Sequence, residues 1–269
     1  MELSLSTSLK IEQAGTLSVS YTKRLGRIWD ARVESPFAFV PSKIVESGIS
    51  PESAIGASRE LGEFAQNFLK DILNSSTDAD RQRRKSKSNK IVAVGCGRGY
   101  DLHWVEEAIR AHLRTIWLDV SDVACQAAIT DLNSQFDQIP NSSSLVHLRP
   151  LVMKAEIRSA LVDPESAGLD LGSVEIWYLC RVLGCLSARS AEIVLQYLGR
   201  SLALCNGSII IVGALLDDNE KYSGSKNSRL MSLKYILKHL SSGSRYDVEV
   251  VKKESYRYFD KIVTALCIR

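Results

Sequence analysis

From residue 91 to its end, the sequence alternates short apolar runs with segments of helical periodicity. Four runs are too short for helices and predict buried strands: 91–94, 115–118, 174–179 and 208–212. Between them, apolar residues recur every three or four positions and predict helices over 102–113, 121–129, 188–203 and 230–240. Three further strands are expected at 145–151, 246–251 and 262–268. Strands that alternate with helices indicate an α/β protein with a parallel, doubly wound sheet.

The first 88 residues have a different pattern. Ser50 and Pro51 supply a hydroxyl N-cap and a first-turn proline, and apolar residues follow at helical spacing, so an amphipathic helix is predicted over 51–73. The polar stretch 74–90 is predicted to be a loop. We therefore expect residues 1–88 to form an N-terminal helical lid or extension with a basic linker, and residues 89–269 to form the main domain.

Charge is concentrated in one place. The run Arg81–Lys90 holds six of the 34 Lys and Arg residues and no acid, so the rest of the chain has 28 basic against 31 acidic residues. The chain is not broadly basic, and a nucleic-acid partner is disfavoured. The run itself is predicted to be a solvated linker, with a docking patch for nucleic acid as the alternative.

Several other classes of protein are disfavoured by composition. No apolar stretch is long enough to cross a membrane, and the first residues lack the pattern of a secretory signal, so a cytoplasmic location is expected. The six cysteines form no Cys-x-x-Cys pair. They are predicted to be buried free thiols, and no metal site is expected.

The segment that carries chemistry is a strand, a glycine-rich turn, a helix and a second strand that ends in an acid. The turn reads Gly95-Cys96-Gly97-Arg98-Gly99, and Asp119 follows twenty residues after Gly99. Glycines let a ligand approach the backbone, the helix N-terminus offers N–H groups, and a carboxylate at this spacing can accept both hydroxyls of a ribose. Tyr100 occupies the third glycine position of a dinucleotide fingerprint, which disfavours NAD.

These residues, VAVGCGRG followed by IWLDVSD, resemble the class I S-adenosylmethionine-dependent methyltransferases, over about residues 90–269. The resemblance implies a Rossmann-like, seven-stranded sheet with a reversed last strand, and S-adenosyl-L-methionine as the cofactor. It places cofactor contacts at Gly95, Cys96, Gly97, Arg98, Gly99, Asp119 and Val120.

Later segments are similar to the small-molecule O-methyltransferase branch. In IWYLCRVLG, Cys180 is assigned to the cofactor site. Arg181 and Leu183 fit the branch, but Gly184 stands where the branch carries a histidine base. Glu156 is the expected adenine contact. Arg181 and His103 are the catalytic candidates, with a surface arginine and a helix-surface histidine as the alternatives.

The acceptor pocket is expected above the strand ends, between the N-terminal segment and the loop 217–228. Substrate contacts are predicted at Tyr21, Arg24, Trp29, Arg181 and Tyr222, although the aromatic residues could instead pack the extra helices against the sheet.

The sequence therefore predicts an enzyme that transfers a methyl group from S-adenosylmethionine to a small organic molecule in specialised metabolism. The expected partner is this acceptor, with a homodimer left open. Two alternatives remain: an RNA or protein methyltransferase, and a non-methylating lyase or pericyclase that binds the cofactor on the same fold.

Overall fold

The computed structural model of the chain describes residues 51–75, 77, 82, 84, 89–95, 104–119, 122–180, 182–183, 186, 188–216, 231–244, 247–258 and 261–269. Five parallel strands form most of a single sheet: β1 (Lys90–Val94), β2 (Arg114–Asp119), β3 (Leu151–Lys154), β4 (Val174–Cys180) and β5 (Ser208–Leu216). Two more strands complete it: β8 (Lys261–Ile268) pairs antiparallel with β5, and β7 (Val250–Tyr258) pairs antiparallel with β8. The order is β3-β2-β1-β4-β5-β8-β7, and the short β6 (Met231–Ser232) pairs with β5. The doubly wound sheet with a reversed last strand is thus confirmed.

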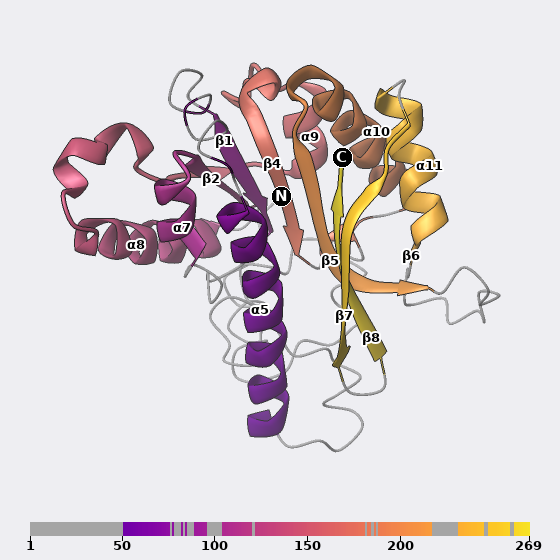
Figure 1. The fold of residues 1–269 in the computed structure, drawn as a ribbon, viewed down its shortest axis with the longest axis horizontal. Coiled ribbons are helices and arrows are strands. Elements are labelled where there is room, and N and C mark those ends of the chain that lie inside the picture. Colours follow the sequence, from indigo (N-terminus) through magenta and orange to yellow (C-terminus); the bar gives the residue numbers. More distant parts are fainter. Residues whose placement is uncertain are drawn as a thin grey trace, which may run out of the picture.

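Helices cover both faces of this sheet (Figure 1). One face carries α5 (Pro51–Asn74), α7 (Val105–Arg110) and α8 (Asp122–Gln138). The other carries α9 (Ile157–Val162), α10 (Ala188–Cys205) and α11 (Leu233–Ser244). Two 3-10 helices, η2 (Ser142–Leu148) and η3 (Leu171–Ser173), lie before β3 and β4. Among the helices described, none has both the length and the apolar character needed to span a membrane.

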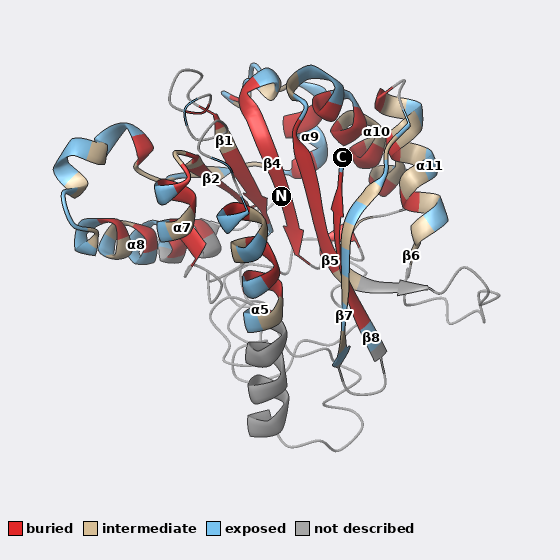
Figure 2. Ribbon diagram, in the orientation of Figure 1, coloured by how far each residue is buried: buried red, intermediate tan, exposed pale blue. Residues whose placement is uncertain are grey.

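The central strands separate two hydrophobic cores. Ile91 and Ala93 point into the core beneath α5, whereas Val92 and Val94 point into the core beneath α10. Successive side chains of a strand point to opposite faces, so a strand that is covered on both faces must be apolar throughout. Figure 2 shows β1, β4 and most of β5 buried almost from end to end. This is why continuous apolar runs in the sequence mark these strands.

Three aromatic side chains pack together in the core at the start of α7. Trp117 on β2 and Tyr178 on β4 lie opposite Ala93 in register. Trp104 stacks on Trp117 at 6.4 Å between ring centroids and meets the ring of Tyr178 edge-on at 5.9 Å. The small side chain of Ala93 leaves space for this arrangement. It fixes the beginning of α7, the helix that follows the glycine-rich turn in sequence.

Helix α5 packs directly on the sheet. Phe68, Leu69 and Leu73 are buried in the same core as β1. Lys252 of β7 donates a hydrogen bond to Asp71 of α5 at 3.0 Å. The predicted helix is confirmed and shares its core with the main domain. The division into 1–88 and 89–269 stays a prediction.

The third strand was placed wrongly by the sequence. Residues 142–148 form the 3-10 helix η2, and β3 begins only at Leu151. Leu145 and Leu148 are three positions apart, which is the period of a 3-10 helix, so both fall on one side of it. Leu148 is buried, whereas Val146, which an apolar run suggested as a strand residue, is 59% exposed. The first closing strand was also placed too early, since β7 starts at Val250.

The basic run is not simply a solvated linker. Within it, Arg84 and Asn89 are buried, and both donate hydrogen bonds to the Glu175 carboxylate on β4. The Arg84 Nε–Oε1 distance is 2.7 Å and the Asn89 Nδ2–Oε2 distance is 2.6 Å. A buried carboxylate requires such partners. Arg84 and Asn89 therefore attach the basic run to the start of β4.

Candidate functional site

The carboxyl ends of the central strands form one level edge. Val94 of β1 pairs with Leu118 of β2 and with Leu179 of β4. The residue after each of these three therefore stands in the same row, so Gly95 lies between Asp119 and Cys180. In an open α/β sheet this edge is where ligands bind, at the point where the strand order reverses. Here the reversal falls between β1 and β4.

Gly95 has a backbone that other residues tolerate poorly. Its φ is +64°, in the left-handed region, and its N–H donates a hydrogen bond to the Leu118 carbonyl at 2.8 Å. A Cβ at this position would lie 2.9 Å from Cγ2 of Val182. Both the turn and the close approach of the loop after β4 therefore require glycine. At Gly95 itself, the backbone is not covered by a side chain of its own.

Asp119 is a buried acid at the end of β2, only 6% exposed. Its main chain is held in place, because its carbonyl accepts a hydrogen bond from the Ala155 N–H at 2.9 Å and the Cys125 thiol lies 3.8 Å from the same oxygen. The structure places Asp119 at the end of β2, beside Gly95, as the sequence predicted. Its contact with a ribose stays a prediction.

Two further predicted contacts occupy different surroundings. Cys180 is buried in the row beside Gly95, and it pairs in register with Val212 of β5. Glu156 is exposed and caps the N-terminus of α9, where its carboxylate accepts hydrogen bonds from the Ser159 N–H at 3.3 Å and hydroxyl at 2.8 Å. This capping is a structural use of Glu156. Its assignment to adenine remains a prediction.

The loop after β4 adds Val182, which sequence reasoning did not single out, next to Leu183, which it matched to the O-methyltransferase branch. Val182 and Leu183 are 8% and 7% exposed and belong to the core beneath α10. Val182 packs closest to Gly95. A valine after a strand gives no specific signal in a single sequence, so this contact could be found only from the fold.

The remaining predicted site residues lie outside the described part of the chain. They are Tyr21, Arg24, Trp29, Cys96, Gly97, Arg98, Gly99, His103, Val120, Arg181 and Tyr222. Gly184 and the loop 217–228 also lie outside it. Their assignments stay predictions. Among the residues that are described, no three His, Cys, Asp or Glu side chains gather closely enough to hold a metal ion.

The described edge has the parts needed to bind a nucleoside. A glycine backbone at the end of β1 admits a ligand at close range, and the neighbouring buried carboxylate is of the type that accepts hydrogen bonds from vicinal hydroxyls.

No protein-family model matches the sequence, and no curated protein matches it. Solved structures do match. An arsenic(III) S-adenosylmethionine methyltransferase from Chlamydomonas reinhardtii aligns with a TM-score of 0.50 at 14% identity, covering 73% of this chain and 71% of that chain.

Two other matches have lower scores. The cyclase SpnF aligns with a TM-score of 0.49 at 14% identity, covering 75% of this chain and 80% of that chain. An O-methyltransferase family protein from Burkholderia thailandensis aligns with a TM-score of 0.48 at 13% identity, covering 98% and 70%. The TM-score of 0.50 with the arsenic(III) methyltransferase shows a shared fold. Together with the strand order and the level edge at Gly95, it shows that this chain has the fold of the class I S-adenosylmethionine-dependent methyltransferases.

Proposed function

We propose that this protein is an S-adenosylmethionine-dependent methyltransferase that acts on a small organic molecule. One observation carries the proposal. Gly95 has a left-handed backbone that a Cβ would crowd against Val182, and the buried acid Asp119 ends the neighbouring strand. The fold and the glycine-rich sequence after β1 support the same cofactor. A place in specialised metabolism and a cytoplasmic location stay predictions.

The residues present fit this cofactor. The Gly95 backbone would lie against its amino-acid part, and Asp119 would hold its ribose. When bound, S-adenosylmethionine supplies a methyl group on a positively charged sulfur, which a nucleophile can take by direct displacement. The protein then has to align the acceptor and exclude water. Val182 and Leu183 supply apolar side chains at this edge.

Three histidines lie in the described part of the chain, and the candidate His103 lies outside it. His112 and His147 line a cavity at the other end of the strands. His239 lies on α11, with its Nδ1 3.7 Å from the Glu192 carboxylate. None of the three therefore stands at the carboxyl edge of β1 and β2. An amine, a thiolate, a carboxylate or a stabilised carbanion needs no general base, and we propose that the acceptor belongs to this group.

The test is to incubate the protein with S-adenosylmethionine carrying an isotope-labelled methyl group, together with a panel of small amines, thiols, carboxylic acids and phenols. Mass spectrometry then shows which product gains the label. The proposal predicts transfer to at least one ionisable acceptor, and about ten- to a hundredfold slower transfer by an Asp119→Asn variant at a cofactor concentration limiting for the wild type. Cofactor that binds tightly and is never consumed across the panel would instead support the non-methylating alternative.

A further inference from the structure

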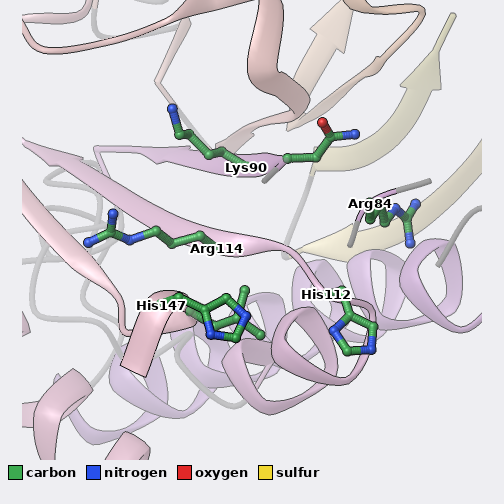
Figure 3. A pocket seen from close by; sticks show the side chains of 7 residues that line it. Arg84, Lys90, His112, Arg114 and His147 are labelled. Carbon is green, nitrogen blue, oxygen red and sulfur yellow. The ribbon is translucent and has the colours of Figure 1, made fainter. Parts of the chain in front are cut away.

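A cavity lies at the amino ends of the strands, away from the edge at Gly95. Its volume is about 350 Å³, and it is lined by two arginines, a lysine, two histidines, Asn89 and Leu148 (Figure 3). Lys90 is the first residue of β1, and Gly95 comes directly after its last residue. The cavity and the Gly95 edge are therefore separated by the length of this strand, about 16 Å at 3.3 Å per residue. Among the described residues that line the cavity, none is acidic.

Two of the lining cations, Lys90 and Arg114, donate hydrogen bonds to neutral groups. Lys90 and Arg114 are register partners at the starts of β1 and β2. Lys90 Nζ donates to the Ser173 hydroxyl at 2.8 Å, and Arg114 Nε donates to the Arg149 carbonyl at 3.0 Å. Within the described residues, no carboxylate pairs with either. In Figure 3 both side chains extend toward the left of the view, that of Lys90 upward from β1 and that of Arg114 along β2.

Arg84 has a different part in the cavity. Its guanidinium is paired with Glu175, so it adds little net charge. Together with Asn89, it ties the basic segment to β4 and holds the chain that leads into Lys90. The basic run of the sequence thus contributes three residues to the lining.

His112 occupies the cavity at a conformational cost. Its φ of 57° is left-handed. It stands just past the end of α7, where its N–H donates to the Ile109 carbonyl and the Leu113 N–H donates to the Ala108 carbonyl, both at 2.9 Å. This is the Schellman arrangement, in which glycine is the usual residue. A histidine at a position suited to glycine therefore holds a strained backbone at the wall of the cavity. His147 adds a second imidazole from η2.

We propose that this cavity binds a small phosphorylated anion, such as a phosphate ester or a pyrophosphate group. Lys90 and Arg114, which have no carboxylate partner among the described residues, and the imidazole of His147 supply the donors that phosphate oxygens prefer. The volume is at the lower end of the range of about 300–1,000 Å³ typical of ligand pockets. Outside the basic run, acidic residues outnumber basic ones, 31 to 28, so the surroundings favour a discrete ligand over an extended polyanion.

Inorganic pyrophosphate is the probe. Calorimetry at constant ionic strength should show saturable binding at one site per chain. Lys90→Met and Arg114→Met keep the apolar stems and remove one charge each, and each should weaken binding about tenfold or more. Lys253→Met makes the same change at an exposed position on β7 and should leave binding unchanged. Lys90→Gln, which can still donate a hydrogen bond toward Ser173, replaces Lys90→Met if that variant unfolds.

Two outcomes would overturn the proposal. One is the absence of saturable pyrophosphate binding to the wild type at millimolar concentration. The other is binding of a mixed-sequence single-stranded RNA that depends on Lys90 and Arg114 while pyrophosphate does not bind, which would make the surface a docking site for nucleic acid. Affinity for S-adenosylhomocysteine is measured in parallel. It should be the same in all these variants, because the cofactor edge lies at the other end of the strands.

Discussion

Gly95 combines a backbone angle and a close contact that both exclude a larger residue. We predict that Gly95→Ala lowers the free energy of unfolding by roughly 1–2 kcal/mol, the cost of a left-handed backbone for an ordinary residue, and also weakens cofactor binding. The clash adds to this cost, since the new Cβ would lie 2.9 Å from Val182 Cγ2. The measurements are urea unfolding and calorimetry with S-adenosylhomocysteine.

Two variants separate the causes. Gly95→Ala/Val182→Ala removes the contact but leaves the strained angle, so it should recover only part of the loss. Gly213→Ala on β5 is the matched control, because a Cβ there meets no atom within 4 Å. If Gly95→Ala behaves like Gly213→Ala in both measurements, Gly95 does not shape the site.

Cys267 illustrates a thiol that burial makes inert. It lies on β8 in the core, and burial raises the pKa of its thiol. The reactive thiolate forms only as the pH rises through the pKa, so a raised pKa leaves the unreactive thiol in place at neutral pH. We predict that iodoacetamide at pH 7.5 does not modify Cys267 in the native protein but does so in urea. Peptide mass spectrometry checks this. Modification of native Cys267 at the rate seen in urea would contradict it.

At the scale of elements, the buried ion pair of Arg84 and Glu175 joins the basic segment to β4. Removing one partner leaves an uncompensated buried charge, so Arg84→Met should lower the free energy of unfolding by about 3–5 kcal/mol. Arg84→Met/Glu175→Gln should cost less than the sum of the two single changes, because neither charge is then left alone.

The control for this pair is Arg110→Met on α7. Arg110 pairs with Glu106, but both side chains are exposed, and such pairs contribute only about 0.3–0.5 kcal/mol. Urea unfolding of all four variants gives the comparison. Equal losses for Arg84→Met and Arg110→Met would show that the segment is not anchored by its buried charge.

Helices α10 and α11 approach each other through facing glycines. A Cβ on Gly199 would lie 2.1 Å from the Leu240 carbonyl oxygen, and one on Gly243 would lie 1.9 Å from that of Gln196. We predict that Gly199→Ala destabilises the protein by about 1–3 kcal/mol, since the helices must move apart. In thermal unfolding this corresponds to a midpoint lower by roughly 2–4 °C per kcal/mol. An unchanged midpoint would contradict the close packing.

The elements that the sequence revealed are those covered on both faces. β1, β4 and β5 are apolar throughout because each lies between two helical layers. The outer strands were harder to find: β3 and β7 end the sheet and carry exposed residues, so their apolar signal is weak and their limits were placed wrongly. Alternating exposed and half-buried residues along β7 are typical of an edge strand.

For the whole molecule, the sequence predicted the sheet and the cofactor edge because the glycine turn and the acid lie within one local unit. It could not reveal the amino edge. Arg84 appeared as one more charge in a polar run, and its partner Glu175 is 91 residues away. The contact of Val182 with Gly95 likewise depends on how the strands align. The result is a sheet with one proposed site at each end of its central strands.

The central claim is that the carboxyl edge at Gly95 and Asp119 holds S-adenosylmethionine. The most direct measurement is a calorimetric titration of the wild type with S-adenosylhomocysteine and, separately, with NAD, followed by the same titrations of Asp119→Asn. We predict that S-adenosylhomocysteine binds and NAD does not. Losing a charge-assisted contact should weaken binding by about ten- to a hundredfold in Asp119→Asn, with its fold preserved. Tight NAD binding without S-adenosylhomocysteine binding, or an unchanged affinity in folded Asp119→Asn, would contradict the claim.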